Sequence, residues 1–173
     1  MEPGFTDVKP GFSVSGGKKL TERGFKIRAL GEIAIRCDSL TAMMDFYERI
    51  IGLDRMSGNA SEGIVFYRIS EGFEGHTNVL ALFERGAGRS DIHPTDDVSP
   101  ATGAGSSLHH LALSLPFSEQ QAVMDWFDVC DQSYNVQNFD WVGWRGIFTT
   151  DPEGNIVELV AYDPASGRNE GAT

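Results

Sequence analysis

The sequence predicts an α+β domain built from two tandem βαβββ modules, and three observations support this prediction. The chain has 173 residues, of which 40% are hydrophobic, so it is long enough to bury a sizeable core. Apolar and polar residues alternate in several short segments, as in half-buried strands, and recur at helical spacing in two longer ones. The two halves of the chain also resemble each other at an offset of about 77 to 80 residues.

The internal repeat is carried by three segments that occur in the same order in both halves. Each pair matches in the position of its apolar residues, and the offset stays nearly constant. Three ordered matches at one offset are improbable by chance, so we interpret them as a duplication. The matched pairs are 32–36 with 110–114, 42–47 with 122–127, and 79–83 with 156–160.

Each half is expected to contain a strand, a helix and three further strands. Asp38 and Ser39 are suitable helix-starting residues, and Gly52 is suited to a helix C-terminus. The sequence Asp-Pro-Glu-Gly-Asn at 151–155 favours a hairpin turn. We predict strands at 31–37, near 54–57, at 64–70, 78–84, 108–115, near 134–141, at 145–150 and 156–162, with helices at 40–52 and 117–130.

Composition then sets the domain boundaries. Residues 1–28 mix Gly, Pro, Ser and Lys without periodicity and are expected to form a flexible N-terminal arm, which could also pair with a partner subunit. The first module is placed at 29–85 and the second at 107–163. A Gly-, Ser- and Pro-rich linker separates them at 86–106, and a flexible tail follows at 164–173.

The charge balance excludes some classes of partner. The net charge of −11 and the pI of about 4.7 argue against a nucleic-acid surface, which requires clustered Lys and Arg. No apolar run approaches the length of a membrane span, and the N-terminus has no apolar signal core.

The two cysteines, Cys37 and Cys130, lack disulfide or metal-ribbon spacing and are expected to be buried free thiols. We therefore expect a cytoplasmic protein that acts on a small molecule.

Strand alternation selects three candidate metal ligands. Glu32, His110 and Glu158 are predicted to lie on the strand faces that point away from the helices. Glu158 interrupts an otherwise apolar strand, where a carboxylate is costly to bury without a partner. If the two sheets curl around one cavity, the three side chains converge. Two carboxylates and one imidazole form a ligand set for a divalent metal.

Other roles for these residues remain open. Glu158 could form a structural salt bridge with Arg36 or Arg145, and Glu32 could be solvated. His109 is adjacent to His110, and only one of the two can face the cavity. The tryptophans Trp141 and Trp144 could belong to the core or the cavity wall, or could stack on a planar ligand.

Four motifs resemble the vicinal oxygen chelate superfamily, which includes glyoxalase I, bleomycin-resistance proteins, extradiol dioxygenases, fosfomycin-resistance enzymes and methylmalonyl-CoA epimerase. The resemblance covers roughly residues 29–163. The motifs are Gly31-Glu32-Ile33-Ala34-Ile35, Asp45-Phe46-Tyr47-Glu48 through Gly52-Leu53, His109-His110-Leu111-Ala112-Leu113, and Asp151-Pro152-Glu153-Gly154-Asn155-Ile156-Val157-Glu158-Leu159.

The resemblance implies curved mixed sheets that form a half-barrel cavity, the glyoxalase/dioxygenase fold. It places the metal ligands at Glu32, His110 and Glu158, and it implies one divalent ion per site, which could be Mn, Fe, Ni, Zn or Co. It further implies a homodimer and isomerase or lyase chemistry, in which Glu158 or Glu32 moves a proton beside a metal-bound carbonyl. Arg36, Trp141 and Trp144 are the candidate substrate-binding residues.

Two departures from the family pattern leave alternatives open. Ala81 occupies the position of the fourth glyoxalase ligand, and Phe148 occupies that of the acid/base tyrosine of extradiol dioxygenases. The chain could therefore be a divergent extradiol dioxygenase, or a metal-free protein that sequesters a drug, as bleomycin-resistance proteins do.

Overall fold

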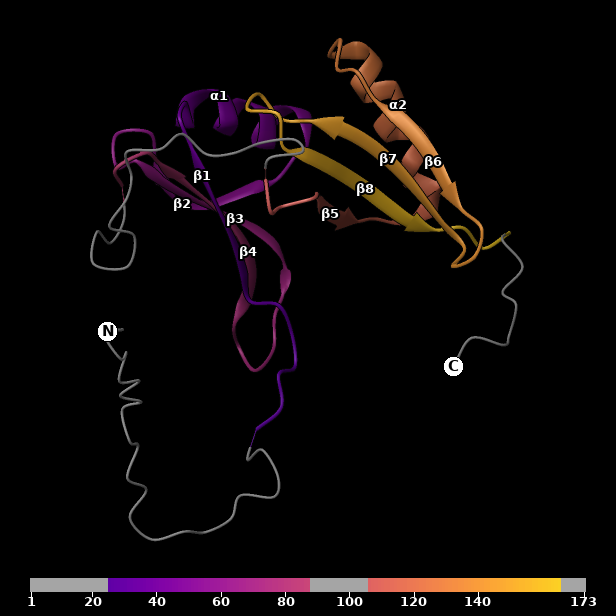
Figure 1. The fold of residues 1–173 in the computed structure, drawn as a ribbon, viewed down its shortest axis with the longest axis horizontal. Helices are drawn as coiled ribbons and strands as arrows, with labels where there is room; N and C mark the ends of the chain where they lie inside the picture. Colours follow the sequence, from indigo (N-terminus) through magenta and orange to yellow (C-terminus); the bar gives the residue numbers. More distant parts are fainter. Residues whose placement is uncertain (1–24, 88–105, 166–173) are drawn as a thin grey trace, which may run out of the picture.

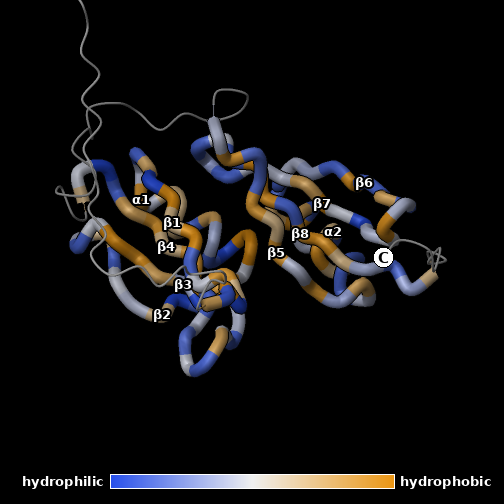
Figure 2. Tube along the Cα trace, turned by 60° about the horizontal axis from the view of Figure 1, so that its bottom comes forward, coloured by the Kyte–Doolittle hydropathy of each residue, from blue (hydrophilic) through white to orange (hydrophobic). Residues whose placement is uncertain are grey.

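A computed structural model describes residues 25–87 and 106–165, which contain two modules that lie side by side (Figure 1). Most of the predicted arm and linker, and most of the predicted tail, lie outside the described residues. Figure 2 shows the same two modules from a second direction, with hydrophobic stretches in the strands of each.

The order of elements in each described module agrees with the predicted βαβββ pattern. The first module contains β1 (Glu32–Cys37), α1 (Leu40–Asp45), η1 (Phe46–Ile50), β2 (Asp54–Asn59), β3 (Ile64–Glu71) and β4 (Thr77–Glu84). The second contains β5 (Leu111–Ser114), η3 (Phe117–Glu119), α2 (Gln120–Val129), β6 (Asn135–Phe139), β7 (Trp144–Thr150) and β8 (Ile156–Tyr162).

Each module has one four-stranded mixed sheet, and the two sheets share one topology. The strand order is β1-β4-β3-β2 in the first sheet and β5-β8-β7-β6 in the second. The first strand of each module pairs in parallel with the last, and the other neighbours are antiparallel. This repeated mixed topology confirms the α+β fold class and the duplication.

The structure departs from the predicted helices and strands at three places. The first helix continues beyond Asp45 as a five-residue π-helix, and the second begins with a 3₁₀ turn. Strand β5 begins at Leu111, so His110 directly precedes the strand instead of lying within it. Gly52 has φ +84° at the end of the first helix, as its position predicted.

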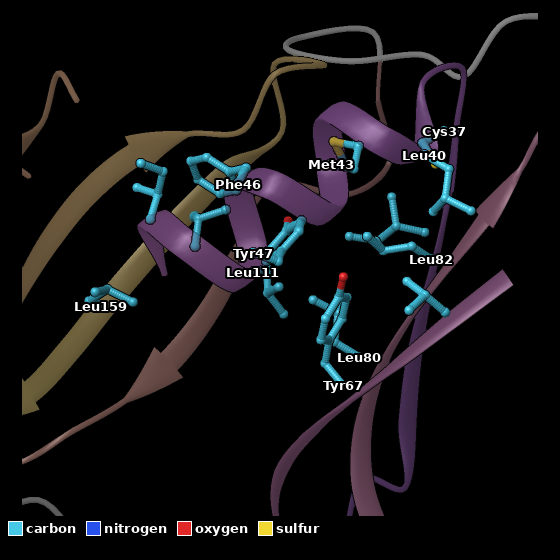
Figure 3. Close-up of a cluster of buried hydrophobic side chains, with 14 of the residues drawn as sticks. Cys37, Leu40, Met43, Phe46, Tyr47, Tyr67, Leu80, Leu82, Leu111 and Leu159 are labelled. Atoms are coloured by element: carbon cyan, nitrogen blue, oxygen red, sulfur yellow. The ribbon is translucent and has the colours of Figure 1, made fainter. Parts of the chain in front are cut away.

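A single apolar core extends across both modules (Figure 3). Tyr47 and Tyr67 are fully buried on the helix side of the first sheet. Figure 3 shows Leu111 and Leu159, which come from the second module, in the same cluster as residues of the first, with Leu111 beside Tyr47. The modules are therefore held together by shared hydrophobic burial. Among the described residues, none of the helices combines the length and the apolar character that a membrane span requires.

The turn at 151–155 also contacts the first module. Glu153 Oε1 accepts hydrogen bonds at 2.7 Å from the backbone N–H groups of both Asp38 and Ser39. Ser39 is the N-cap residue of α1, and its own side chain makes no capping bond. The predicted helix start is thus correct, but a carboxylate from the second module caps it.

Candidate functional site

The candidate site lies on the open face of the second sheet, which is the face opposite α2. Strand register places Phe148 directly across from Glu158 on β7, and Ala112 across from it on β5. The alternating residues Ile147 and Leu159 point the other way and pack into the core below α2. The period-2 pattern of β8 therefore predicted correctly which face carries Glu158.

His110 and Glu158 meet on this open face. His110 Nε2 lies 3.2 Å from Glu158 Oε2. The Glu158 side chain is only 7% exposed, whereas that of His110 is 33% exposed. A largely buried carboxylate thus has a partly exposed imidazole as its neighbour.

Glu158 is held between ring and backbone atoms. Burial raises the pKa of its carboxyl, and the adjacent His110 partly offsets this rise. A Cβ built on Gly146 would lie 2.3 Å from Glu158 Oε1 and 2.7 Å from Phe148 Cε2. The carboxylate therefore lies directly over bare backbone of β7. The Phe148 ring also meets the His110 ring edge-on, with 6.2 Å between centroids.

His109 extends the cluster toward solvent. Its Nδ1 lies 2.7 Å from Nδ1 of His110, so one of the two nitrogens donates and the other accepts. His109 is exposed and His110 is half-buried. Of the two adjacent histidines, His110 is the one that reaches Glu158.

The sequence left open a salt bridge between Glu158 and Arg145, and the structure does not contain it. The Arg145 guanidinium lies on the helix side of the sheet, where its Nε donates to Gln120 Oε1 at 2.5 Å and it stacks over the Phe117 ring. Arg36 is half-buried on β1 of the first module, on the same face as Glu32.

Glu32 does not join the other two predicted ligands within the described part of the chain. Its side chain is exposed at the start of β1, and register places it across from Val79. In residues 25–87 and 106–165, no group of three or more His, Cys, Asp or Glu side chains is close enough to hold a metal ion. The structure thus brings together His110 and Glu158 and leaves Glu32 apart.

The two candidate substrate-binding tryptophans occupy different settings. Trp141 lies in the turn between β6 and β7 and is 84% exposed. Trp144 is half exposed on β7, across from Tyr162 on β8, and both share the open face with Glu158. Phe139 packs edge-on against Phe148 on this face, so aromatic side chains extend along it.

A hollow of about 290 Å³ lies at one end of this face and shares the Phe148 side chain with the site, although neither His110 nor Glu158 lines it. Phe148, Thr150 and Ile156 line it, together with Ser133, Asn135 and Thr149. None of these side chains is ionisable, so the hollow is suited to an uncharged part of a small ligand.

The sequence interpretation missed Gly146 and Gln120. Glycine inside a strand often marks a close approach, and this signal could have identified Gly146. Gln120 is fully buried, and its Nε2 donates to the backbone carbonyls of Arg145 and Leu159. A polar residue on the apolar face of a helix was the corresponding signal for Gln120.

The His110–Glu158 pair fits part of a divalent metal site. Two donor atoms about 90° apart around an ion, each about 2.1 Å from it, lie about 3.0 Å from each other. The Nε2–Oε2 separation of 3.2 Å is close to this value. Imidazole nitrogen and carboxylate oxygen are also ordinary ligands for such ions.

Comparison with known proteins shows the fold. Neither the family models nor the curated proteins contain a match to this chain. Among solved structures, a glyoxalase/dioxygenase from Nostoc punctiforme has a TM-score of 0.58 at 19% identity, covering 88% of this chain and 97% of that one. A lactoylglutathione lyase from Agrobacterium tumefaciens has a TM-score of 0.56 at 19% identity, covering 79% and 95%.

A third solved structure is the fosfomycin resistance protein FosX from Listeria monocytogenes, with a TM-score of 0.53 at 13% identity, covering 78% of this chain and 91% of that one. The chain therefore has the fold of these solved glyoxalase/dioxygenase structures. This confirms the predicted resemblance at the level of fold.

Proposed function

We propose that the protein is a divalent-metal-dependent enzyme that moves a proton on a small oxygen-chelating substrate, as an isomerase or lyase. The observation that carries the proposal is the His110–Glu158 pair, with its Nε2–Oε2 distance of 3.2 Å on the open face. His110 and Glu158 would hold the ion, which when bound supplies Lewis-acid stabilisation of a substrate oxyanion.

Glu158 is the proposed base. Its carboxylate has two oxygens, of which Oε2 faces His110 and Oε1 lies over Gly146. An oxygen of Glu158 would take a proton from the hydroxyl-bearing carbon beside the substrate carbonyl and return it to the former carbonyl carbon, while the hydroxyl proton passes to the former carbonyl oxygen. Phe148 and the surrounding sheet would exclude water from this carboxylate, and the adjacent hollow would hold the uncharged part of the substrate.

A second copy of the chain is proposed to supply Glu32. Within one chain Glu32 is exposed and remains apart from the pair. In a symmetric dimer, Glu32 of each copy could approach His110 and Glu158 of the other, which would give two equivalent three-ligand sites. Arg36 shares a face with Glu32 and would then bind a carboxylate or phosphate of the substrate.

Metal content tests the proposal directly. We expect about one divalent ion per chain after gentle purification, and a melting temperature that falls after chelation and recovers with added Mn, Fe, Ni, Zn or Co. Glu158→Gln and His110→Ala should each lower metal affinity by more than the roughly 10- to 100-fold found when groups that only orient the ligands are changed, without unfolding the protein. Metal-induced stabilisation that survives both substitutions would contradict the assignment.

Mixing two inactive variants tests whether the site forms between chains. Glu32→Gln and His110→Ala are unfolded together and refolded. A hybrid dimer would contain one site in which Glu32 and His110 are both intact, so about one quarter of the sites should recover if pairing is random. If all three ligands come from one chain, no site recovers, and Glu32 would then have to reach the pair by rearrangement within its own chain.

Metal-free ligand binding is the second candidate function. Trp144 and Tyr162 are exposed on the open face, which also carries the Glu158 carboxylate. Aromatic faces and a carboxylate together suit a planar cationic ligand. Protein that has no metal and no thermal response to added ions, but binds aromatic cations with quenching of tryptophan fluorescence, would favour this second function.

A further inference from the structure

Gly146 occupies an unusual position in the second sheet. It lies in β7, two residues before Phe148 and on the same face of the strand, and register pairs it with Val160 of β8. It is buried although it lies on the open face, because the Glu158 carboxylate and the Phe148 ring extend over its backbone. The space that a side chain would occupy at residue 146 is thus already filled by the side chain of the proposed base.

The distances from a Cβ at residue 146 to the neighbouring atoms show how little space is left there. A Cβ at residue 146 would lie 2.3 Å from Glu158 Oε1, 2.7 Å from Phe148 Cε2 and 3.1 Å from Glu158 Cδ. All three atoms belong to the ends of side chains, and none belongs to the backbone. A methyl group would therefore displace the carboxylate and the ring while leaving the strand in place.

Backbone conformation does not explain the glycine. Among the described residues, the glycines with positive φ lie in turns, after the first helix or near the end of β2, and Gly146 is not among them. An L-residue can adopt the extended conformation of β7 at this position. Within the strand, the feature that excludes a side chain is the space taken by Glu158 and Phe148.

We propose that Gly146 is a positioning residue that fixes the Glu158 carboxylate against β7 with Oε2 facing His110. The inference rests on the proposed function in so far as Glu158 is a metal ligand and base. With any side chain at residue 146, Glu158 must leave the sheet surface, and the geometry of its contact with His110 changes. The bare backbone thus contributes to the site without touching the substrate.

Gly146→Ala is the direct test. We expect metal affinity, measured by calorimetric titration with Mn²⁺ and Zn²⁺, to fall about 10-fold or more, in the range found when groups that orient metal ligands are changed. The ¹⁵N and ¹H signals of the His110 imidazole should shift in metal-free protein. The melting temperature should change little, because the displaced atoms are side-chain ends at the open face.

A double-mutant cycle separates positioning from a general loss of structure. Glu158→Asp shortens the side chain, so its carboxylate needs less of the space above residue 146. Glu158→Asp should therefore cost less metal affinity in the Gly146→Ala background than in the wild-type background, which is a favourable coupling between the two sites. If Gly146→Ala folds poorly, Gly146→Ala/Phe148→Leu is compared with Phe148→Leu alone, since the smaller side chain removes the second contact.

The outcomes distinguish the two proposals. Wild-type metal affinity and unchanged His110 signals in Gly146→Ala would overturn the positioning role while leaving the metal-dependent function standing. If the wild-type protein binds no metal, the proposed function fails. The positioning role is then decided by the His110 signals alone, and a shift in Gly146→Ala supports it whereas no shift rejects it.

Discussion

The hydroxyl of Tyr47 donates a hydrogen bond to Asp151 Oδ2 at 3.1 Å, and this bond joins the two modules. Tyr47 is fully buried in η1, whereas Asp151 opens the turn between β7 and β8. The same carboxylate also accepts hydrogen bonds from the backbone N–H groups of Glu153 and Asn155, and from the Asn155 side chain. Since β8 begins directly after this turn, the contact helps to place Glu158 relative to the first module.

Tyr47→Phe should destabilise the protein by about 1–2 kcal/mol, because it removes one hydrogen bond to a buried carboxyl that keeps three other donors. Urea unfolding of the variant and the wild type measures this difference. Tyr67→Phe is a matched comparison, since its hydroxyl bonds to Glu48 within the first module at 2.9 Å. Limited proteolysis should then cut between the modules faster in Tyr47→Phe than in Tyr67→Phe, and equal rates would argue against an intermodule role.

Glu153→Ala should destabilise the protein by about 0.5–2 kcal/mol, as the loss of a helix cap does. The physical reason is that Glu153 Oε1 satisfies the N–H groups of Asp38 and Ser39 at the start of α1. Thermal unfolding of the two proteins provides the measurement.

Glu74→Ala is the matched control for the cap. Glu74 precedes Gly75 (φ +85°) in the first module as Glu153 precedes Gly154 (φ +84°) in the second, but Glu74 is exposed and, unlike Glu153, has a positive φ of 49°, which alanine must also adopt. We expect a change within about 0.5 kcal/mol at this position. A loss of stability as large as that of Glu153→Ala would mean that the turn itself, not the cap, is responsible.

The sequence predicted local structure well and contacts between modules poorly. Period-2 alternation predicted the bounds of β8 and the face that carries Glu158, because strand geometry follows from neighbouring residues. Turn chemistry predicted the hairpin at 151–155. The bond from Ser39 to Glu153 spans 114 residues, and no local pattern encodes it. Glu32 was placed on the correct face, but whether it meets His110 depends on how the sheets are arranged.

The free energy of unfolding should fall as the pH rises above about 9, because the Cys37 thiol keeps its proton in the folded protein and loses it in the unfolded one. Burial, and to a smaller extent the nearby carboxylates of Glu153, Glu84, Asp151 and Asp38, together raise the pKa of this thiol to about 12. The folded state thus keeps a proton that the unfolded state loses near its ordinary pKa of about 9. The stabilisation is fully present below that pH and is lost as the pH rises toward 12.

Comparison of Cys37→Ala with the wild type isolates this effect, since lysines and tyrosines titrate in both proteins. The free energy of unfolding should decline less steeply between pH 9 and about 11 in Cys37→Ala. Folded wild-type protein should also react with iodoacetamide at Cys130, which is partly exposed, and not at Cys37. Identical pH slopes in the two proteins would contradict the assignment.

Gln120→Leu should be among the most destabilising single substitutions, costing about 2–4 kcal/mol, because it leaves several buried polar groups unsatisfied. Gln120 is the first residue of α2, and its Nε2 donates to Arg145 O at 2.7 Å and to Leu159 O at 3.1 Å. Its Oε1 accepts from Arg145 Nε. One amide thus connects the helix to β7 and β8, next to Gly146 and Glu158, while a leucine of similar volume fills the space but forms none of these bonds.

Gln121→Leu controls for the loss of an amide from the same helix. Gln121 is exposed, and its Nε2 bonds only to Asp125 Oδ1, at 2.8 Å, among the hydrogen bonds of the described residues. Urea unfolding should show a change within about 0.5 kcal/mol for Gln121→Leu and a far larger one for Gln120→Leu. Equal stability of the two variants would mean that solvent or a rearranged Arg145 satisfies the carbonyls. In that case packing alone would hold α2 against the sheet.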